Sequence, residues 1–364
     1  MMKAITQHRY GSYEVLTYEE IDRPTPGAGQ VLLRVAAAGV DPGQWHMMAG
    51  LPLAARLAFG LSRPRARVRG RDVAGTVVAL GPALPMGKQS KATVPGPALP
   101  MGKQSKATVL GPALPMGKQS KATVRGSVTA LAVGDEVFGV ADGSFAEYAV
   151  AKASLVVRRP ASVTPVQAAA TPTSGYTALR AIAKTSLAPG QRALVIGAGG
   201  GVGTMLVQVL ASRGVLVTGA CSASKLDLVR SLGAASVIDY RVSPLGVGYD
   251  AVFDIAGLRG LGDLRALLTS HGTLVLIGGE DDGRWVGGAT TRSLRAHLLN
   301  LVTTQRLRPV LALENRADLE ELASLLAAGT LTPLIDRTFA LAETPAALRL
   351  LMEGEARGKL VVTP

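Results

Sequence analysis

The chain has 364 residues, of which 48% are hydrophobic, and its formal net charge is +13. This length allows a large core and predicts two domains. The only cysteine, Cys221, excludes an internal disulfide and favours a reducing, cytoplasmic location. We expect no secretory signal, because residues 1–16 have no continuous apolar segment, and no membrane span, because the uncharged run 193–212 is interrupted by a glycine cluster.

A short repeat follows the first eighty residues. The stretch GPALPMGKQSKATV occurs three times, beginning at Gly81, Gly96 and Gly111, and the units differ only at their fifteenth residue. Each unit is rich in Gly, Pro and Lys and has no aromatic or acidic residue, so its composition predicts flexible or polyproline-like chain. We interpret residues 81–125 as a passenger insertion.

The segments on either side of the repeat read as one hairpin. If residues 81–125 are removed, RGRDVAGTVVAL joins GSVTALAVGDEVFG, a pattern of strand, short turn and strand. Hairpin tips tolerate insertions well. The alternative is a basic interaction arm, because six lysines and Arg125 place +7 of the net charge there. No aromatic residue lies between the lysines, so we expect no specific nucleic-acid partner.

A glycine cluster in QRALVIGAGGGVGTMLVQVLASRGVLVTGAC is the most specific motif of the chain. ALVI is typical of a buried parallel strand, residues 202–213 of a helix, and residues 215–220 of the next strand. The glycines therefore lie where a strand turns into a helix, which is where backbone N–H groups bind a dinucleotide diphosphate. The expected cofactor-binding residues of this loop are Gly197, Gly200, Gly201, Val202 and Gly203.

The end of the second strand indicates which dinucleotide is bound. NAD sites usually have an acidic residue there, whose carboxylate binds the ribose 2′-hydroxyl. This chain has Cys221-Ser222-Ala223-Ser224-Lys225 and no acidic residue before Asp227. Ser222 and Lys225 would bind a 2′-phosphate, which favours NADPH. The alternative is that Lys225 is an ordinary solvated lysine.

Strands and helices continue to alternate after the glycine cluster. SVIDY, YDAVFDIAG, TLVLIGG and RPVLAL are each expected to be strands, with helical patterns between them. This alternation predicts an α/β fold with a doubly wound parallel sheet.

The chain resembles the zinc-free quinone oxidoreductase branch of the medium-chain dehydrogenase/reductase family. The resemblance rests on MKAITQHRYGSYEVL, PGAGQVLLRVAAAGVDPGQWHMMAG, GRDVAGTVVAL, DGSFAEYAV, AAATPTSGYTALRAI, PGQRALVIGAGGGVGT and IDRTFALAETPAALRLLMEGEARGKLVV, and it covers nearly everything except the repeat. It implies a GroES-like β-barrel catalytic domain from residues 1–157 and 331–364, and a Rossmann NADP-binding domain from residues 158–330.

The resemblance also assigns further cofactor-binding residues. Thr177, in the SGYTA segment, is expected near the phosphates or the nicotinamide. Tyr240 in VIDY and Arg357 in EARGK are expected near the 2′-phosphate.

The nicotinamide and its acceptor are expected in the cleft between the domains. Ile277, Gly278 and a strand at Leu311 would border the nicotinamide. Trp45 would stack on a planar acceptor, and His46 would supply a proton. The alternative for Trp45 and His46 is that they only pack or face solvent.

The chain departs from the family pattern along the same cleft wall. Asp41, the third candidate catalytic residue, replaces the usual Asn of the AGVDP segment. Gln44 replaces a family Asp, and Leu51 follows Gly50 where a Tyr is often found. Asp72, in GRD, is expected to be a structural anchor rather than a catalyst.

The same family contains zinc alcohol dehydrogenases, but this sequence lacks their ligands. Val40 or Asp41 lies at the position of the first zinc Cys, and Arg71 lies at the position of the zinc His. A structural zinc lobe needs four cysteines, and the chain has one. We therefore expect no metal. Without a Lewis acid, the sequence favours acceptors that take hydride readily, such as quinones and α,β-unsaturated carbonyl compounds.

The sequence leaves three functions open. The first is an NADPH-dependent quinone or enone reductase, expected to form a homodimer because the family commonly dimerises. The second is an enoyl-thioester reductase, in which four arginines near the cleft would bind a phosphate-bearing substrate: Arg63, Arg65, Arg67 and Arg69. The third is a non-catalytic nucleotide-binding module with the repeat as its interaction arm.

Overall fold

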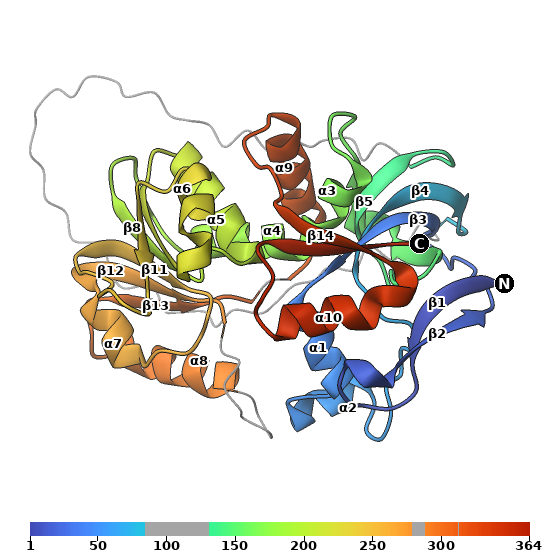
Figure 1. The fold of residues 1–364 in the computed structure, drawn as a ribbon, viewed down its shortest axis with the longest axis horizontal. Coiled ribbons are helices and arrows are strands. Elements are labelled where there is room, and N and C mark those ends of the chain that lie inside the picture. Colours follow the sequence, from blue (N-terminus) through green and yellow to red (C-terminus); the bar gives the residue numbers. More distant parts are fainter. Residues whose placement is uncertain (84–130, 279–287, 312) are drawn as a thin grey trace, which may run out of the picture.

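The computed structural model describes residues 1–83, 131–278, 288–311 and 313–364. Within these residues the chain forms two large β-sheets, each covered by helices, and one small two-stranded sheet (Figure 1). The repeat from residue 84 onward lies outside the described residues, and so does the loop 279–287.

The strands of the two large sheets and the small sheet are bounded as follows: β1 Met2–Gln7, β2 Leu16–Ile21, β3 Gln30–Val40, β4 Asp72–Leu80, β5 Glu136–Val140, β6 Tyr148–Lys152, β7 Val156–Arg158, β8 Arg192–Ile196, β9 Leu216–Cys221, β10 Ser236–Asp239, β11 Tyr249–Asp254, β12 Leu268–Leu276, β13 Arg306–Pro309, β14 Ile335–Ala340 and β15 Lys359–Thr363. The α-helices are α1 Pro42–Ala49, α2 Arg56–Phe59, α3 Pro165–Ala169, α4 Pro172–Ile182, α5 Gly201–Ser212, α6 Leu226–Ser231, α7 Leu261–Ala266, α8 Gly288–Leu299, α9 Arg316–Ala327 and α10 Thr344–Met352. Short 3-10 helices are η1 Tyr13–Val15, η2 Leu53–Ala55, η3 Ala153–Leu155, η4 Ala223–Lys225 and η5 Leu341–Glu343.

The six strands β8 to β13 form a parallel sheet in the order β10-β9-β8-β11-β12-β13. Numbered from β8, this is the order 3-2-1-4-5-6 of the dinucleotide-binding fold, so the predicted doubly wound Rossmann sheet is confirmed. Its central strands β8, β9 and β11 are largely apolar because both of their faces are buried. Side chains of α4, α5 and α9 pack on one face, and those of α7 and α8 pack on the other (Figure 1).

The second large sheet is the predicted GroES-like barrel. Its strands follow the order β14-β15-β3-β4-β5-β7, with β6 paired to β3. β14 and β15 come from the end of the chain, and β15 pairs antiparallel with β3, with Val361 opposite Gly39. The C-terminal segment therefore completes a sheet that begins before the Rossmann strands. The residue boundaries assigned to the two domains stay a prediction.

One predicted strand ends earlier than expected. RPVLAL, residues 308–313, was expected to be a strand up to Leu313, but β13 ends at Pro309. Leu311 lies after the strand and is 73% exposed. The run RPVLAL therefore contains the end of β13 followed by exposed chain. The spacing of its apolar residues does not show where the strand ends.

The strands that flank the repeat pair as the excised sequence predicted. β4 and β5 are antiparallel neighbours, with Thr76 opposite Glu136. The connection between them begins at Gly81, whose N–H donates to the Gln30 carbonyl at 2.8 Å. Leu131, the first described residue beyond the gap, packs against the barrel core.

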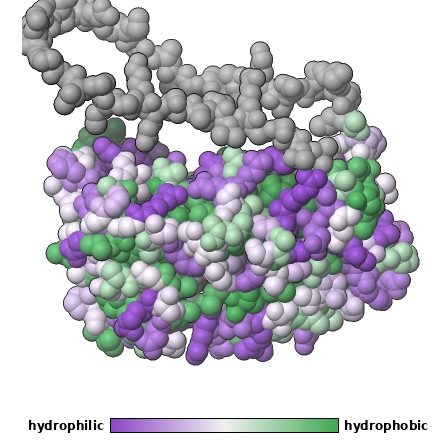
Figure 2. Space-filling view, turned by 90° about the horizontal axis from the view of Figure 1, so that it is seen from above, coloured by the Kyte–Doolittle hydropathy of each residue, from purple (hydrophilic) through white to green (hydrophobic). Residues whose placement is uncertain are grey.

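The face seen in Figure 2 mixes hydrophilic and hydrophobic residues in small patches. Among the residues that the structure describes, no helix is long and apolar enough to cross a bilayer.

Removal of residues 81–125 should leave the fold intact. A Cβ at Gly81 would lie 1.9 Å from the Gly27 carbonyl oxygen, so this position needs glycine. After the removal, Gly126 follows Leu80 and supplies it. Shortening the connection between β4 and β5 from 55 residues (81–135) to 10 lowers the entropic cost of closing it by about 1.5 kcal/mol. We expect the Tm in calorimetry to equal or exceed that of the full chain.

A matched chain that lacks only residues 96–125 keeps the native Gly81 and one repeat unit, and it serves as the control. If both shortened chains melt several degrees below the full chain, the repeat contributes to folding and is no passenger.

Candidate functional site

The glycine loop between β8 and α5 has the backbone geometry of an anion site. Gly197 has a φ of +90°, which favours glycine, and its N–H donates to the Ala220 carbonyl at 3.0 Å. A Cβ at Gly203 would lie 2.2 Å from the Gly197 carbonyl oxygen, so only glycine lets the helix approach the loop. The N-cap of α5 is Gly200, which has no side chain to accept from the first helical N–H groups. These groups and the positive end of the helix are suited to a diphosphate.

The other predicted loop residues lie at the seam between the two sheets. Val202 packs against the core from the first turn of α5. A Cβ at Gly201 would lie 2.8 Å from Cδ of Lys359 and 3.1 Å from Oγ of Ser174. Thr177 lies on α4, which packs against α5, and its hydroxyl donates to the Thr173 carbonyl at 2.7 Å.

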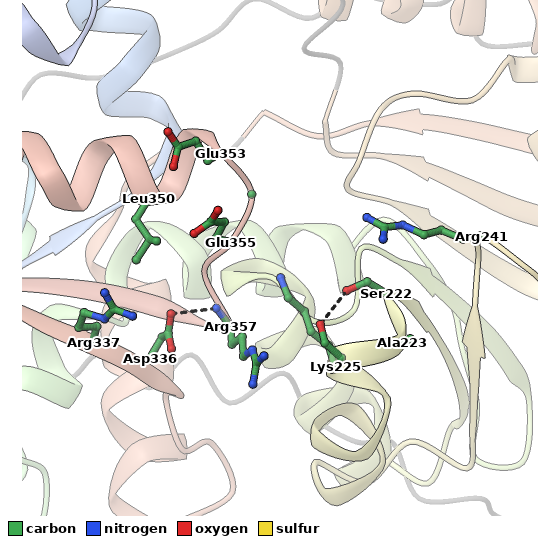
Figure 3. Close-up of a pocket in the computed structure, with 12 residues that line it drawn as sticks. Ser222, Ala223, Lys225, Arg241, Asp336, Arg337, Leu350, Glu353, Glu355 and Arg357 are labelled. Carbon is green, nitrogen blue, oxygen red and sulfur yellow. Dashed lines mark hydrogen bonds between the residues drawn. The ribbon is translucent and has the colours of Figure 1, made fainter.

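A pocket of about 740 Å³ opens at the end of β9 (Figure 3). It contains three of the predicted cofactor-binding residues: Ser222, Lys225 and Arg357. Tyr240 is not among its lining residues; Arg241, whose guanidinium lies 5.8 Å from the Tyr240 ring, takes that place. The complete lining is Ser222, Ala223, Ser224, Lys225, Arg241, Asp336, Arg337, Leu350, Glu353, Gly354, Glu355 and Arg357.

Lys225 spans this pocket from one domain to the other. Its stem covers the glycine loop, since a Cβ at Gly199 would lie 2.7 Å from Lys225 Cδ. Its ammonium donates to the Ala356 carbonyl at 2.6 Å, and burial lowers its pKa. On the opposite wall the N–H of Arg357 donates to Asp336 at 3.1 Å. The pocket thus joins basic residues of both domains, with carboxylates among them (Figure 3).

Ile277 and Gly278 lie where β12 ends, at the carboxyl edge of the parallel sheet. Both N–H groups donate to the Asp254 carbonyl, at 3.0 and 3.2 Å. A Cβ at Gly278 would lie 1.9 Å from the Ile255 carbonyl oxygen, so a side chain has no room there. Ligands of open α/β sheets bind at this edge, so both residues occupy suitable positions. Leu311 does not extend the edge as a strand.

The three candidate catalytic residues lie on or next to α1. Asp41 is the N-cap, and its Oδ1 accepts from the Gly43 N–H at 3.0 Å, while Pro42 at the first position favours the helix. Asp41 is only 3% exposed. The Trp45 ring packs partly against the barrel core and meets the His46 ring edge-on, with centroids 4.9 Å apart.

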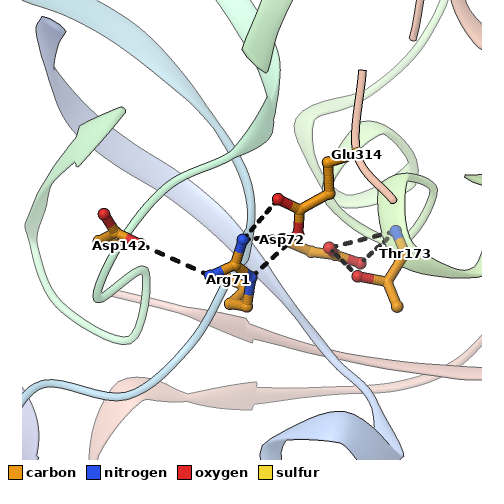
Figure 4. Close-up of polar contacts among 5 residues, drawn as sticks. All are labelled: Arg71, Asp72, Asp142, Thr173 and Glu314. Carbon is orange, nitrogen blue, oxygen red and sulfur yellow. Dashed lines mark hydrogen bonds and ion pairs between the residues drawn. The ribbon is translucent and has the colours of Figure 1, made fainter. Parts of the chain in front are cut away.

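Three charged side chains meet at one end of β15, β3 and β4. Leu360 pairs with Val40 and Ala38 pairs with Val73, so Lys359, Asp41 and Asp72 each lie one residue beyond these pairs, and a Cβ at Gly39 would lie 3.0 Å from Asp72 Cβ. All three charged groups are buried, and among the described residues neither the Lys359 ammonium nor Asp41 Oδ2 has a hydrogen-bond partner. Asp72 accepts from the N–H and the hydroxyl of Thr173, at 3.1 and 2.5 Å (Figure 4). Asp72 therefore anchors the start of α4, in agreement with its expected structural role.

Burial changes the ionisation of these carboxyl groups. It raises the pKa of Asp72 to about 7, with a further increase from the negative charge of Asp41, while Lys359 and the Thr173 bonds oppose the shift. Burial also raises the pKa of Asp41 above its ordinary value, against the attraction of Lys359. Both shifts favour the neutral carboxyl.

Arg71, at the position of the zinc His, binds a carboxylate instead. Its Nη2 lies 2.5 and 2.6 Å from the two Glu314 oxygens, and its Nη1 lies 3.6 Å from Asp142 (Figure 4). Glu314 follows β13, so this bidentate pair links the barrel to the Rossmann sheet. A guanidinium cannot coordinate zinc, and no group of three potential metal ligands occurs within the described ranges. The residues present do not fit a catalytic zinc.

Sequence reasoning missed several residues around the site. Glu314 comes from a segment without a motif, and Asp336 lies in the C-terminal segment that carries the family resemblance, but no local signal separates either from an ordinary surface acid. Lys359 could have been noticed, since it lies two residues after Arg357 and begins a strongly apolar strand.

Comparison with known proteins identifies both domains. Residues 27–161 match the family described as alcohol dehydrogenase GroES-like domain, and residues 232–362 match the family described as zinc-binding dehydrogenase. A chloroplast envelope quinone oxidoreductase homolog from Arabidopsis thaliana is 27% identical over 382 residues, covering 100% of this chain and 99% of the relative.

Two solved structures share the complete fold. The quinone oxidoreductase of Coxiella burnetii superposes with a TM-score of 0.76 at 24% identity, covering 100% of this chain and 99% of that chain. A mycobacterial protein solved in complex with NADPH gives a TM-score of 0.74 at 25% identity, covering 100% of both chains.

Asp72→Asn should flatten the pH dependence of stability. The folded pKa is about 7, above the ordinary value of 3.8, so between these values the folded state binds more protons than the unfolded state. Stability should therefore fall as the pH rises through this window. The amide of Asn still accepts from Thr173 but does not titrate. We expect the free energy of unfolding in urea to fall less between pH 4 and pH 7 than in the wild type.

Asp227→Asn is the control, because the Asp227 side chain is 97% exposed. Identical pH slopes for wild type and Asp72→Asn would contradict the raised pKa of Asp72.

Proposed function

Because the chain belongs to the quinone oxidoreductase-like branch of the medium-chain dehydrogenase/reductase family, we propose that it is a zinc-independent NADPH-dependent reductase of quinones or α,β-unsaturated carbonyl compounds. The observation that carries the proposal is the pocket at the end of β9. It unites Ser222, Lys225 and Arg357 directly beside the glycine loop.

The basic residues of this pocket favour a phosphorylated ribose. An ammonium and a guanidinium form charge-assisted hydrogen bonds with phosphate oxygens. Lys225 now donates to the Ala356 carbonyl, and it would exchange this acceptor for the 2′-phosphate. The glycine loop and the N-terminus of α5 would bind the diphosphate. The relative solved with NADPH supports the same choice of cofactor.

NADPH supplies the hydride when it is bound, and the chain positions the acceptor and excludes water. Ile277 and Gly278 lie at the sheet edge where the nicotinamide of such cofactors is bound. Trp45 offers a flat apolar surface for a planar acceptor. His46, whose ring meets the Trp45 ring edge-on, is the candidate proton donor. Asp41 would act by fixing the first turn of the helix that carries both.

The missing zinc ligands determine which acceptors are suitable. A simple alcohol gives up hydride only when its oxygen is deprotonated, which a metal promotes. Arg71 and Glu314 neutralise each other and leave no Lewis acid. Quinones and conjugated carbonyls accept hydride without one, and their proton can come from water.

A second candidate, reduction of an enoyl thioester, is favoured by one observation. Arg63, Arg65 and Arg67 line a hollow on the barrel, where they would meet a phosphate-bearing substrate. Measuring NADPH oxidation with quinones, enals and enoyl thioesters tests both candidates. No turnover with any of the three, together with intact NADPH binding, would favour a non-catalytic nucleotide-binding module. The homodimer and the cytoplasmic location stay predictions.

Lys225→Ala should weaken NADPH binding and leave NADH binding unchanged. The variant removes one charge-assisted contact to the 2′-phosphate, which is worth roughly 1–3 kcal/mol, or about fivefold to 150-fold in Kd. Cofactor fluorescence gives both dissociation constants. Lys184→Ala, at an exposed lysine, is the matched control. If Lys225→Ala weakens NADPH and NADH equally, Lys225 does not bind the 2′-phosphate.

A chelator should change neither the turnover nor the Tm. The chain has one cysteine, and Arg71 stands where a zinc ligand is needed. Elemental analysis of the purified protein should find zinc far below one atom per chain. Stoichiometric zinc that leaves together with activity on chelation would refute the zinc-independent mechanism.

A further inference from the structure

The segment that contains α2 exposes large apolar side chains instead of burying them. Leu57 is 72% exposed, Phe59 42% and Leu61 70%. The three residues lie on α2 and directly after it, and α2 lies at the lower edge of the molecule in Figure 1, beside α1. Single exposed apolar residues are common on protein surfaces, whereas a cluster of them marks a contact surface. We call Leu57, Phe59 and Leu61 the apolar tip.

The charged residue of α2 contacts the barrel, while the apolar residues of the tip face solvent. Arg56 Nε donates to the Gly50 carbonyl at 2.9 Å, and the Arg56 guanidinium lies 4.4 Å from the centroid of the Tyr10 ring. Gly50 is the C-cap of α1. An ordinary surface helix buries its apolar residues and exposes its charged ones. In α2 this arrangement is reversed, as it is in segments that bind an apolar partner.

The backbone of the tip is held by the rest of the barrel. The Tyr10 hydroxyl donates to the Gly60 carbonyl at 2.6 Å, and the Arg65 N–H donates to the Phe59 carbonyl at 2.8 Å. Gly60 has a φ of +121°, and a Cβ there would lie 2.1 Å from the Arg63 carbonyl oxygen, so this turn requires glycine. An anchored segment loses less entropy on binding than a free loop does. The exposure of the tip is therefore part of the fold.

The sequence around the tip is basic. Residues 42–71 contain six arginines and no acidic residue. Arg63 and Arg67 are exposed, and Arg67 Nη2 lies 3.3 Å from Nδ1 of His8. Beyond His8 lies Glu19, whose carboxylate offsets part of the Arg67 charge. The other four arginines already have partners within the protein: Arg56, Arg65, Arg69 and Arg71. The apolar tip is thus followed by exposed positive charge.

We propose that the apolar tip is a docking surface for an anionic lipid bilayer. A bilayer interface accepts apolar side chains at the acyl boundary and cations at the level of the headgroup phosphates. The chain provides these two kinds of side chain in separate blocks, the apolar block at residues 57–61 and the basic block at residues 63–67. The sequence order therefore matches the layers of such an interface.

Two other occupants fit the tip less well. A stable protein–protein interface uses roughly 20–30 residues on each side, whereas the tip offers three large apolar ones. Single-stranded nucleic acid stacks on aromatic side chains interleaved with cations, and Phe59 is the only aromatic residue between positions 46 and 71. A bilayer needs neither a matching shape nor aromatic stacking.

Docking would bring the predicted acceptor site close to the bilayer. Arg56 fastens α2 to the C-cap of α1, and Trp45 and His46 lie on α1, which is about 12 Å long. An apolar acceptor dissolved in the bilayer would then reach the cleft without crossing water. This consequence rests on the proposed function, whereas the docking itself does not.

Vesicle flotation with the full chain tests the docking. The vesicles consist either of phosphatidylcholine alone or of phosphatidylcholine with one third phosphatidylglycerol. The tip variant is Leu57→Ser, Phe59→Ser and Leu61→Ser together.

The control variant is Val242→Ser, Val247→Ser and Leu258→Ser, which removes the same number of exposed apolar side chains from the Rossmann domain. Every variant keeps the lysines of the repeat, so these lysines do not contribute to the differences.

On the anionic vesicles the wild type and the control should have partition coefficients within twofold of each other, and the tip variant should have one at least tenfold lower. An unchanged Tm shows that the tip variant is folded. If it does not fold, the single changes Leu57→Ser and Leu61→Ser should each lower the partition coefficient at least threefold. Equal partitioning of the wild type and the folded tip variants overturns the proposal.

The charge of the lipid is tested separately. Arg63→Gln with Arg67→Gln should lower partitioning into the anionic vesicles at least threefold and leave partitioning into phosphatidylcholine alone within twofold. Arg34→Gln with Arg295→Gln, at exposed arginines outside the segment, should stay within twofold of the wild type on both. Equal losses in the two pairs would show that net charge alone attracts the chain, against an anionic lipid site beside the tip.

Two further results would assign the tip to another occupant. A dimeric wild type and a monomeric tip variant in sedimentation velocity, with equal vesicle binding, would make the tip an interface between two copies. Loss of DNA oligonucleotide binding at physiological salt in the tip variant, with vesicle binding kept, would make it a nucleic-acid surface. The vesicle assay contains neither NADPH nor an acceptor, so failure of the proposed function leaves its result unaffected.

Discussion

The pairing of β15 with β3 is the constraint on which the arrangement of the site depends. After the Rossmann strands the chain returns to the barrel sheet with β14, and β15 then pairs with β3, where Val361 lies opposite Gly39. The residues just before β15 therefore lie at the seam between the domains. Arg357 reaches the cofactor pocket and Ala356 accepts from Lys225, so one wall of the pocket is built by the end of the chain. A cofactor in this pocket would contact both domains at once.

The same strand end brings buried charges together. Transferring an isolated charge from water into a protein interior costs several kcal/mol, so Lys359, Asp41 and Asp72 are tolerable only as a group. Burial, and after it the negative charge of Asp41, raise the pKa of Asp72 to about 7, while Lys359 opposes the shift. The hydrogen bonds from Thr173 then tie this group to α4 and hence to the Rossmann side. The same group of residues therefore balances the buried charges and connects the two domains.

Much of the fold could be predicted because its signals are local. Gly197 is required by a positive φ and Gly203 by close helix packing, and β8 and β9 are apolar on both faces. The strand β13 was expected to continue to Leu313 but ends at Pro309, because the residues after Pro309 are as apolar as those of a strand. The Arg71–Glu314 pair could not be predicted, since its partners are 243 residues apart and only the packed domains bring them together. Arg69 was expected near the surface with Arg63, Arg65 and Arg67, but it is only 6% exposed. Burial depends on neighbours in space, which the local sequence does not show.

Arg71 shows how one substitution changes the chemistry that a shared fold can support. A zinc ligand at this position would place a Lewis acid between the domains, whereas a guanidinium places a permanent cation there. Left unpaired, that cation would attract anions into the cleft. Glu314 binds it with both oxygens, and the pair joins the two domains. In the zinc-independent mechanism that we propose, the electrostatic help that a metal gives to an alkoxide is absent, and positioning alone suits acceptors that are already electrophilic.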